Sequence, residues 1–259
     1  MTGPKNHGVE TEAEIDVLLA FADDEHLMGQ QHTEWIGVAP FLEEDLAFAS
    51  IGQDELGHAV MLYELVLELR DTETSDLEID RLAYRRGDDE YRSAALVEFP
   101  TNDWAEALVR HWIYDTVEAR RWSLLEGSAN ESLRAITASA LREESYHLRH
   151  ANALVDSLLI DPEGRSRLDA ALDVILPLVP GLLHGAAGEP EAIASSFITG
   201  SLADLADEIA TAISERFERP VSLPASTDGE HDRAQRSDAF GPLMTRMREV
   251  LDYDPEASW

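Results

Sequence analysis

The chain has 259 residues, no cysteine and a single lysine, Lys5, among its 20 basic residues. Without cysteine there is no disulfide framework, thiolate zinc site or cysteine-ligated iron–sulfur cluster, so a metal would have to bind carboxylates and imidazoles. Long apolar runs are missing too: the opening MTGPKNHGVE lacks the apolar core of a signal peptide, and the most apolar stretch, 170–188, is interrupted by Asp173, Pro177 and Pro180. These absences predict a cytoplasmic protein without a membrane span.

Acidic residues outnumber basic ones 52 to 20, which gives a formal net charge of −32. Such an excess repels nucleic acid and anionic membranes, so neither is expected as a partner. The acids are spread along the whole chain, which fits an acidic partner-binding block less well than a surface suited to concentrated salt, where screening weakens self-repulsion. We interpret the charge as a halophilic adaptation and not as evidence of function.

Apolar residues at helical spacing predict an all-α protein with one principal core. The ends of the main segments carry helix signals, such as the capping-box spacing Thr11-x-x-Glu14 and the pair Asp103 and Glu106. The predicted helices cover about 11–37, 40–70, 104–126, 131–159, 166–176, 191–217 and 241–251, with a short one near 88–97. We therefore expect a ferritin-like four-helix bundle with additional C-terminal helices over residues 1–219, followed by a flexible linker and a short helix over 220–259.

Two Glu-x-x-His motifs occur, Glu55 with His58 and Glu144 with His147. Each pair falls within a row of apolar residues that recur every three or four positions, so both motifs should point into the core. An unpaired carboxylate there would cost several kcal/mol, at about the scale expected for buried ions, so something must compensate it.

The other two long helices offer one acid each. Asp115 interrupts the apolar row that runs from Leu108 to Trp122, with Glu118 as its helical neighbour. On the first helix Glu34 and Glu25 lie on different faces. We favour Glu34, because a residue near the end of this helix can lie level with the middle of the antiparallel second helix.

Dinuclear ferritin-like centres have a known ligand pattern: two of the helices each give one carboxylate, and the other two each give a Glu-x-x-His motif. The predicted metal ligands and catalytic residues are Glu34, Glu55, His58, Asp115, Glu144 and His147. Two iron ions, Fe²⁺ or Fe³⁺, suit this oxygen-rich set with one imidazole per metal, and manganese is the weaker alternative. A single mid-helix histidine is more often a hydrogen-bonded core residue, but coordinated polar positions on four helices favour a metal site. Asp54 and Glu143, which precede the motif glutamates, are candidates to accept hydrogen bonds from the ligands, although simple solvent exposure is an equally good expectation in so acidic a chain.

The strings QQHTEWIGVAPFLEEDLAFASIGQDELGHAVMLYELV, EFPTNDWAEALVRHW and REESYHLRH resemble the phenylacetyl-CoA monooxygenase (ring epoxidase) family over about residues 12–185. The stretch FLEEDLAFA and the ending YHLRH most resemble its C subunit, which in typical members is an iron-free structural partner of the catalytic A subunit. This sequence retains residues that match the metal positions of the A subunit, in HTEWIG, QDELGH and EESYH and at Asp115.

The resemblance implies a subunit of a multicomponent di-iron oxygenase of aerobic phenylacetate catabolism. Its activity would be the O₂-dependent ring epoxidation of phenylacetyl-CoA or a related aromatic acyl-CoA. Its partners would be a homologous helical oxygenase subunit and a separate reductase as electron donor. A non-catalytic structural subunit of the same complex is the main alternative, and a ferritin-like iron oxidase is a weaker one. No residues for binding CoA can be assigned from the sequence.

If the acidic surface is a salt adaptation, the melting temperature should rise when salt is raised from low to molar concentration, because repulsion among the 52 acids is then screened. Thermal unfolding followed by circular dichroism across a KCl series measures this. A melting temperature that stays flat or falls would contradict the halophilic interpretation.

Overall fold

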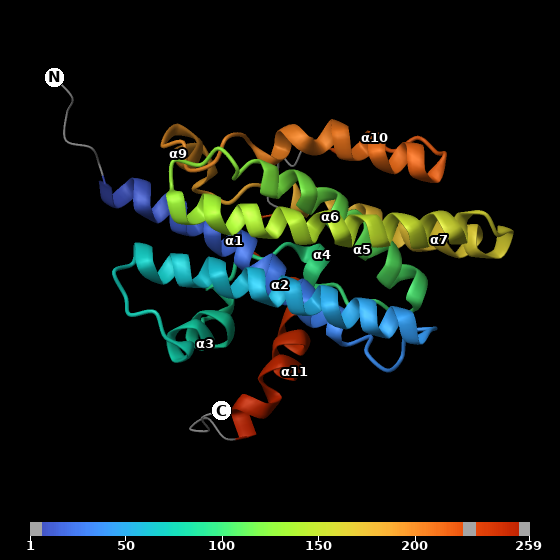
Figure 1. Cartoon of the computed structure of the whole chain (residues 1–259), viewed down its shortest axis with the longest axis horizontal. Coiled ribbons are helices and arrows are strands. Elements are labelled where there is room, and N and C mark those ends of the chain that lie inside the picture. The colour runs from blue at the N-terminus through green and yellow to red at the C-terminus, as the bar shows by residue number, and fades with distance from the viewer. Residues whose placement is uncertain (1–6, 225–231, 254–259) are drawn as a thin grey trace.

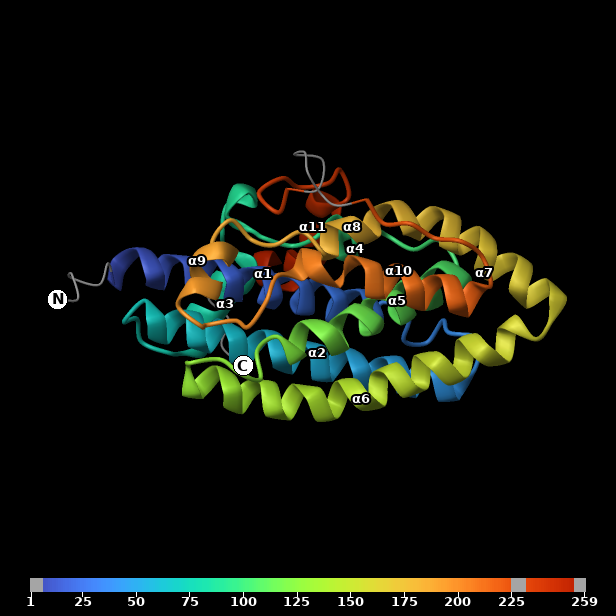
Figure 2. The same cartoon turned by 90° about the horizontal axis from the view of Figure 1, so that it is seen from above.

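The chain folds around four long helices, which run along its longest axis (Figures 1 and 2). A computed structural model describes residues 7–224 and 232–253, and no strand occurs in these two ranges. The four helices are α1 (His7–Thr33), α2 (Leu42–Leu69), α5 (Trp104–Ser123) and α6 (Glu131–Leu159). Helix α1 pairs with α2, α5 pairs with α6, and α2 also packs on α6. The predicted all-α class and ferritin-like bundle are confirmed.

Several helix ends are where the sequence places them. The Asp103 side chain accepts a hydrogen bond of 3.0 Å from the Glu106 amide and so caps α5. At the start of α6 the Asn130 side chain accepts one of 2.9 Å from the Leu133 amide. Helix α1 ends at Thr33, four residues earlier than predicted, and this difference changes the position of one expected ligand.

The connection from α2 to α5 contains α3 (Asp76–Tyr84), the 3₁₀ turn η1 (Asp88–Glu90) and α4 (Ala95–Glu98). The predicted helix over 88–97 is therefore wrong. The reason lies in contacts distant in sequence: the Arg92 amide donates to Asp23 and the Ala94 amide donates to Asp24, both at 2.7 Å. Backbone amides that bond to acids of α1 are not available for helical hydrogen bonds.

The C-terminal half adds short helices around the bundle: α7 (Pro162–Ile175), η2 (Leu176–Leu178), α8 (Val179–Leu182), α9 (Glu189–Ala194), η3 (Leu202–Leu205), α10 (Ala206–Phe217) and α11 (Phe240–Tyr253). The predicted helix over 191–217 is divided, because the chain turns at Ser196, whose φ of 63° is left-handed. Helix α11 packs through Phe240, Leu243 and Met244, and its far end projects from the bundle (Figure 1).

The predicted linker is only partly described, since residues 225–231 lie outside the described ranges. Arg233, which follows them, is 2% exposed and contacts the Asp24 carboxylate at 2.9 Å. Its guanidinium also donates to the backbone oxygens of Leu182, His184 and Arg92. The described end of the linker is thus anchored in the bundle, and the division into two segments stays a prediction.

A close approach of two glycines sets the register between α1 and α2. A Cβ atom on Gly29 would lie 3.0 Å from the Gly52 oxygen and 2.8 Å from Leu56 Cγ. Glu25 lies one turn before Gly29 on α1, and Glu55 and His58 lie one to two turns after Gly52 on α2. Because the two helices are antiparallel, these side chains face one another.

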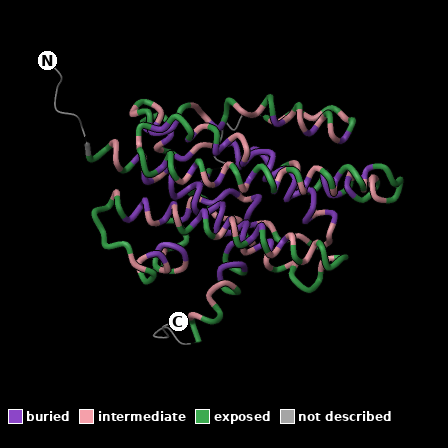
Figure 3. The backbone as a smooth tube through the Cα atoms, in the orientation of Figure 1, coloured by how far each residue is buried: buried purple, intermediate pink, exposed green. Residues whose placement is uncertain are grey.

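The interior between the four helices is buried along its length (Figure 3). Among the helices in the described ranges, none is both long and apolar enough to cross a bilayer.

We expect Gly29→Ala to lower the free energy of unfolding by about 1–3 kcal/mol, because the added methyl overpacks the contact with α2. Gly57→Ala on α2 is the matched control: nothing lies within 4 Å of its Cβ position, so the better helix propensity of alanine should stabilise by about 0.5–1 kcal/mol. Urea unfolding of both variants measures the difference. If both variants changed the free energy of unfolding equally and in the same direction, the close approach of Gly29 to Gly52 would not determine how α1 and α2 pack.

Candidate metal centre

The two Glu-x-x-His motifs bring four side chains to the interior of the bundle. Glu55 and His58 on α2 are each 1% exposed, and Glu144 and His147 on α6 are 2% and 0% exposed. The spacing of three residues places each glutamate and its histidine on one helix face, as the sequence predicts.

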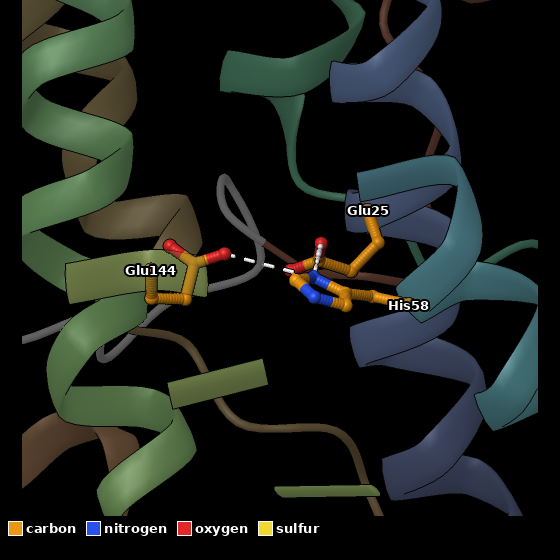
Figure 4. Close-up of side chains that lie close together, drawn as sticks. All are labelled: Glu25, His58 and Glu144. Atoms are coloured by element: carbon orange, nitrogen blue, oxygen red, sulfur yellow. Dashed lines mark hydrogen bonds and ion pairs between the residues drawn. The ribbon is translucent and has the colours of Figure 1, made fainter. Parts of the chain in front are cut away.

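One of these histidines lies in a compact group with two acids. His58 Nδ1 is 3.2 Å from Glu25 Oε2 and 3.6 Å from Glu144 Oε1 (Figure 4). Ligands at right angles on one ion, with bonds of about 2.1 Å, lie about 3 Å apart. The three donor atoms lie within 4.8 Å of one another, so the group from α1, α2 and α6 could hold a metal ion.

Glu34 lies outside this group, which is a correction to the sequence-based expectation that it points into the core. Because α1 ends at Thr33, the chain has already turned at Glu34, and the side chain is 33% exposed. Its carboxylate pairs with Arg246 of α11 at 3.0 Å. Glu25, the alternative on the other face of α1, is fully buried and takes the position opposite His58.

Asp115 of α5 is buried, as predicted, and both of its carboxylate oxygens lack a hydrogen-bond partner within the described residues. Its neighbour Glu118 is also buried but lies 3.0 Å from the Arg121 guanidinium. A cation of the protein therefore already faces Glu118, whereas no arginine or lysine pairs with Asp115 in the described ranges. This difference supports Asp115 over Glu118 as a ligand.

The outward nitrogens of the two motif histidines contact acids in a reciprocal pattern. His58 of α2 lies 2.7 Å through Nε2 from Glu143 of α6, and His147 of α6 lies 3.1 Å through Nε2 from Asp54 of α2. Each acid directly precedes the motif glutamate of the opposite helix. Both expectations for these acids hold in part: they contact the histidines, and their side chains remain 36% to 40% exposed. The contacts orient both rings with Nδ1 inward, toward the buried acids.

The buried acids repel one another. Burial, together with the charges of Glu25 and Asp115, raises the pKa of Glu55 well above its ordinary value. Burial also raises the pKa of Glu144, although nearby His147 opposes this. Burial is the largest influence on Glu25 and would raise its pKa as well, but the hydrogen bond and charge of His58, together with Glu118 and the charge of Arg121, lower the pKa overall.

Burial and the neighbouring charges also shift the pKa values of the two motif histidines, His58 and His147. Burial alone would lower their pKa values, but the surrounding carboxylates raise the pKa of His58 to about 9 and that of His147 to about 10. Several donor atoms still lack a hydrogen-bond partner within the described residues: Glu55 Oε1, Asp115 Oδ1 and Oδ2, Glu144 Oε1 and His147 Nδ1. Concentrated negative charge and unpartnered donors suit a site for divalent cations.

Three residues that the sequence-based interpretation did not single out lie at the centre. His32 Nδ1 is 2.6 Å from Glu55 Oε2, and the Tyr114 hydroxyl donates to Glu25 at 3.2 Å. His111 Nδ1 is 3.2 Å from an oxygen of Asp115. His111 could have been found from the sequence, because it is four residues from Asp115 and so on the same helix face. The other two depend on the register between helices, which spacing within one helix does not reveal.

Comparison with known proteins agrees with this architecture. Residues 4–259 match the model of the family described as phenylacetic acid catabolic protein. Over 140 residues the chain is 33% identical to the C subunit of 1,2-phenylacetyl-CoA epoxidase from Escherichia coli (strain K12). That match covers 54% of this chain and 55% of the E. coli protein, about half of each. Because the family model matches nearly the whole sequence, the chain belongs to the phenylacetic acid catabolic protein family.

Proposed function

We propose that this chain is an oxygenase subunit that binds two iron ions and takes part in the O₂-dependent epoxidation of an aromatic acyl-CoA such as phenylacetyl-CoA. The observation that carries the proposal is the buried group of Glu25, His58 and Glu144, with further unpartnered donors beside it. Burial of carboxylates that repel one another lowers stability, and a bound cation would offset this cost.

The ligand set we propose is Glu25, Glu55, His58, Asp115, Glu144 and His147. Glu25 replaces Glu34, and the other five are those that the sequence predicts. Glu144 Oε1 lies 3.6 Å from His58 Nδ1 and 3.3 Å from His147 Nδ1, so Glu144 could bind an ion together with either histidine. An oxygen-rich set with imidazoles suits iron, and manganese remains the weaker candidate.

Iron bound here would supply the electrons that activate O₂. The chain's own residues keep the ligands oriented and exclude water. Glu143 and Asp54 hold the outer nitrogens of the motif histidines. Trp122, fully buried, packs with its ring 5.4 Å from that of His58, and Phe48 packs 4.9 Å from His32. These aromatic side chains leave little room for bulk water beside the carboxylates.

A specific observation favours a second candidate, a scaffold role in the same complex. The E. coli relative is named as the C subunit of the epoxidase, and Arg121 already neutralises part of the buried negative charge beside Glu118. Under this second candidate the carboxylate group would be a remnant without bound iron. The two candidates differ in metal content, which can be measured directly.

The connection between α1 and α2 supports a complex with a homologous helical subunit. Five large apolar side chains of this connection and of the start of α2 are between 49% and 70% exposed: Ile36, Val38, Phe41, Leu42 and Leu46. A run of exposed apolar side chains in so acidic a chain is typical of a protein–protein contact. We also propose a separate reductase as the source of electrons.

For the ligand assignment, we expect Glu25→Gln to reduce ferrous iron affinity by more than about 10-fold, because it removes a charged ligand. Glu34→Gln is the matched control: its carboxylate pairs with Arg246 at the surface, so iron binding should be unchanged. Anaerobic equilibrium dialysis of both variants measures this. If Glu34→Gln loses iron and Glu25→Gln does not, the structural placement of the ligand on α1 is incorrect.

For the function, we expect His147→Ala to lower bound iron and epoxidation of phenylacetyl-CoA together, while the complex with the partner protein stays assembled, since the apolar face of α6 is kept. Iron analysis, size-exclusion chromatography and turnover with partner and reductase measure these three properties. Loss of iron with full turnover would place catalysis in the partner. An unmutated chain that purifies without metal under anaerobic, iron-replete conditions would establish the scaffold role.

A further inference from the structure

His111 is a fully buried histidine of α5 that belongs to no predicted motif. Its side chain is 0% exposed, and neither ring nitrogen has a hydrogen-bond partner within the described residues. A buried polar group without a partner lowers stability, so its retention in the core calls for a physical reason.

The neighbour of His111 supplies that reason. His111 Nδ1 lies 3.2 Å from Asp115 Oδ1, but the contact lacks hydrogen-bond geometry, and both atoms are unpartnered within the described residues. The same holds for His147 Nδ1 and Glu144 Oε1, which lie 3.3 Å apart. A separation of about 3 Å without a directed hydrogen bond fits two ligands that share an ion.

Another buried histidine, His26, serves as a comparison, because in the described ranges it lacks hydrogen-bond partners and pairs with no acid of the proposed ligand set. His26 also has two unpartnered nitrogens within the described residues, and its ring packs edge-on against Tyr84 at 4.9 Å, much as the His111 ring packs edge-on against His32 at 4.8 Å. Burial, the largest influence, lowers the pKa of His26 to about 4, so it is a neutral packed ring. Lack of a partner alone therefore does not mark a ligand, and the acid beside His111 is the distinguishing feature.

We propose that His111 is a metal ligand that shares an ion with Asp115, at a second metal position beside the group of Glu25, His58 and Glu144. This inference rests on the proposed function and refines it. The first position, with Glu25, His58 and Glu144, has one imidazole, and with His147 of the proposed ligand set the second would have two. The centre is therefore asymmetric, and the position richer in nitrogen should favour Co²⁺ or Fe²⁺ over Mn²⁺ more strongly than the other.

The test is an anaerobic titration of the full chain with Co²⁺ as the probe, followed by visible absorption and equilibrium dialysis. The unmutated chain should bind two ions with different affinities. His111→Ala should weaken one of them by more than about 10-fold and leave the other unchanged. His26→Ala, the matched control, removes an equally buried unpartnered imidazole and should leave both affinities unchanged.

X-ray absorption of the unmutated cobalt protein tests the same inference without a variant, so it holds even if His111→Ala fails to fold. We expect three imidazoles for two ions, from His58, His111 and His147. Two imidazoles, or unchanged Co²⁺ binding in His111→Ala, would overturn the role of His111 while leaving the dinuclear site intact. Failure of the unmutated chain to bind Co²⁺ at all would overturn both this inference and the proposed function.

Discussion

Electrostatic repulsion between acids enclosed by the four long helices is the constraint on which the rest of this structure depends. Glu25, Glu55, Asp115, Glu118 and Glu144 are all buried within one interior. Their charges can persist there only with cations or hydrogen-bond donors at close range. The motif histidines of α2 and α6 supply such groups from two sides of the bundle, and the outer acids Glu143 and Asp54 orient them.

The sequence Asp23-Asp24-Glu25 of α1 shows how selective this compensation is. Asp23 pairs with Arg86, and Asp24 pairs with Arg121 at 2.6 Å. Glu25 has no direct ion pair with an arginine in the described ranges and contacts His58 instead. Three successive buried acids thus receive different partners, and only the third meets a group that can also coordinate a metal. Permanent cations stabilise the two structural acids, and a histidine is placed where an ion could bind.

Spacing within single helices was sufficient to predict the long helices, both Glu-x-x-His motifs and the inward direction of Asp115. The choice of Glu34 over Glu25 was wrong in its geometry, because it depended on where α1 ends and on the register with α2. That register comes from the approach of Gly29 to Gly52, which joins residues far apart in the sequence. The missed break between η1 and α4 has a similar origin, since acids of α1 bond to its backbone. Contacts between segments, unlike periodicity, leave no local pattern to read.

The burial of Arg233 has a consequence for how the chain is made. Asp24, directly before Glu25, emerges early from the ribosome, whereas Arg233, one of its two arginine partners, follows 209 residues later. During translation the helix that carries Glu25 therefore spends most of its time without one of the cations that stabilise it. The set of contacts that holds this part of α1, and with it the position of Glu25, is therefore complete only once the segment with Arg233 has been made.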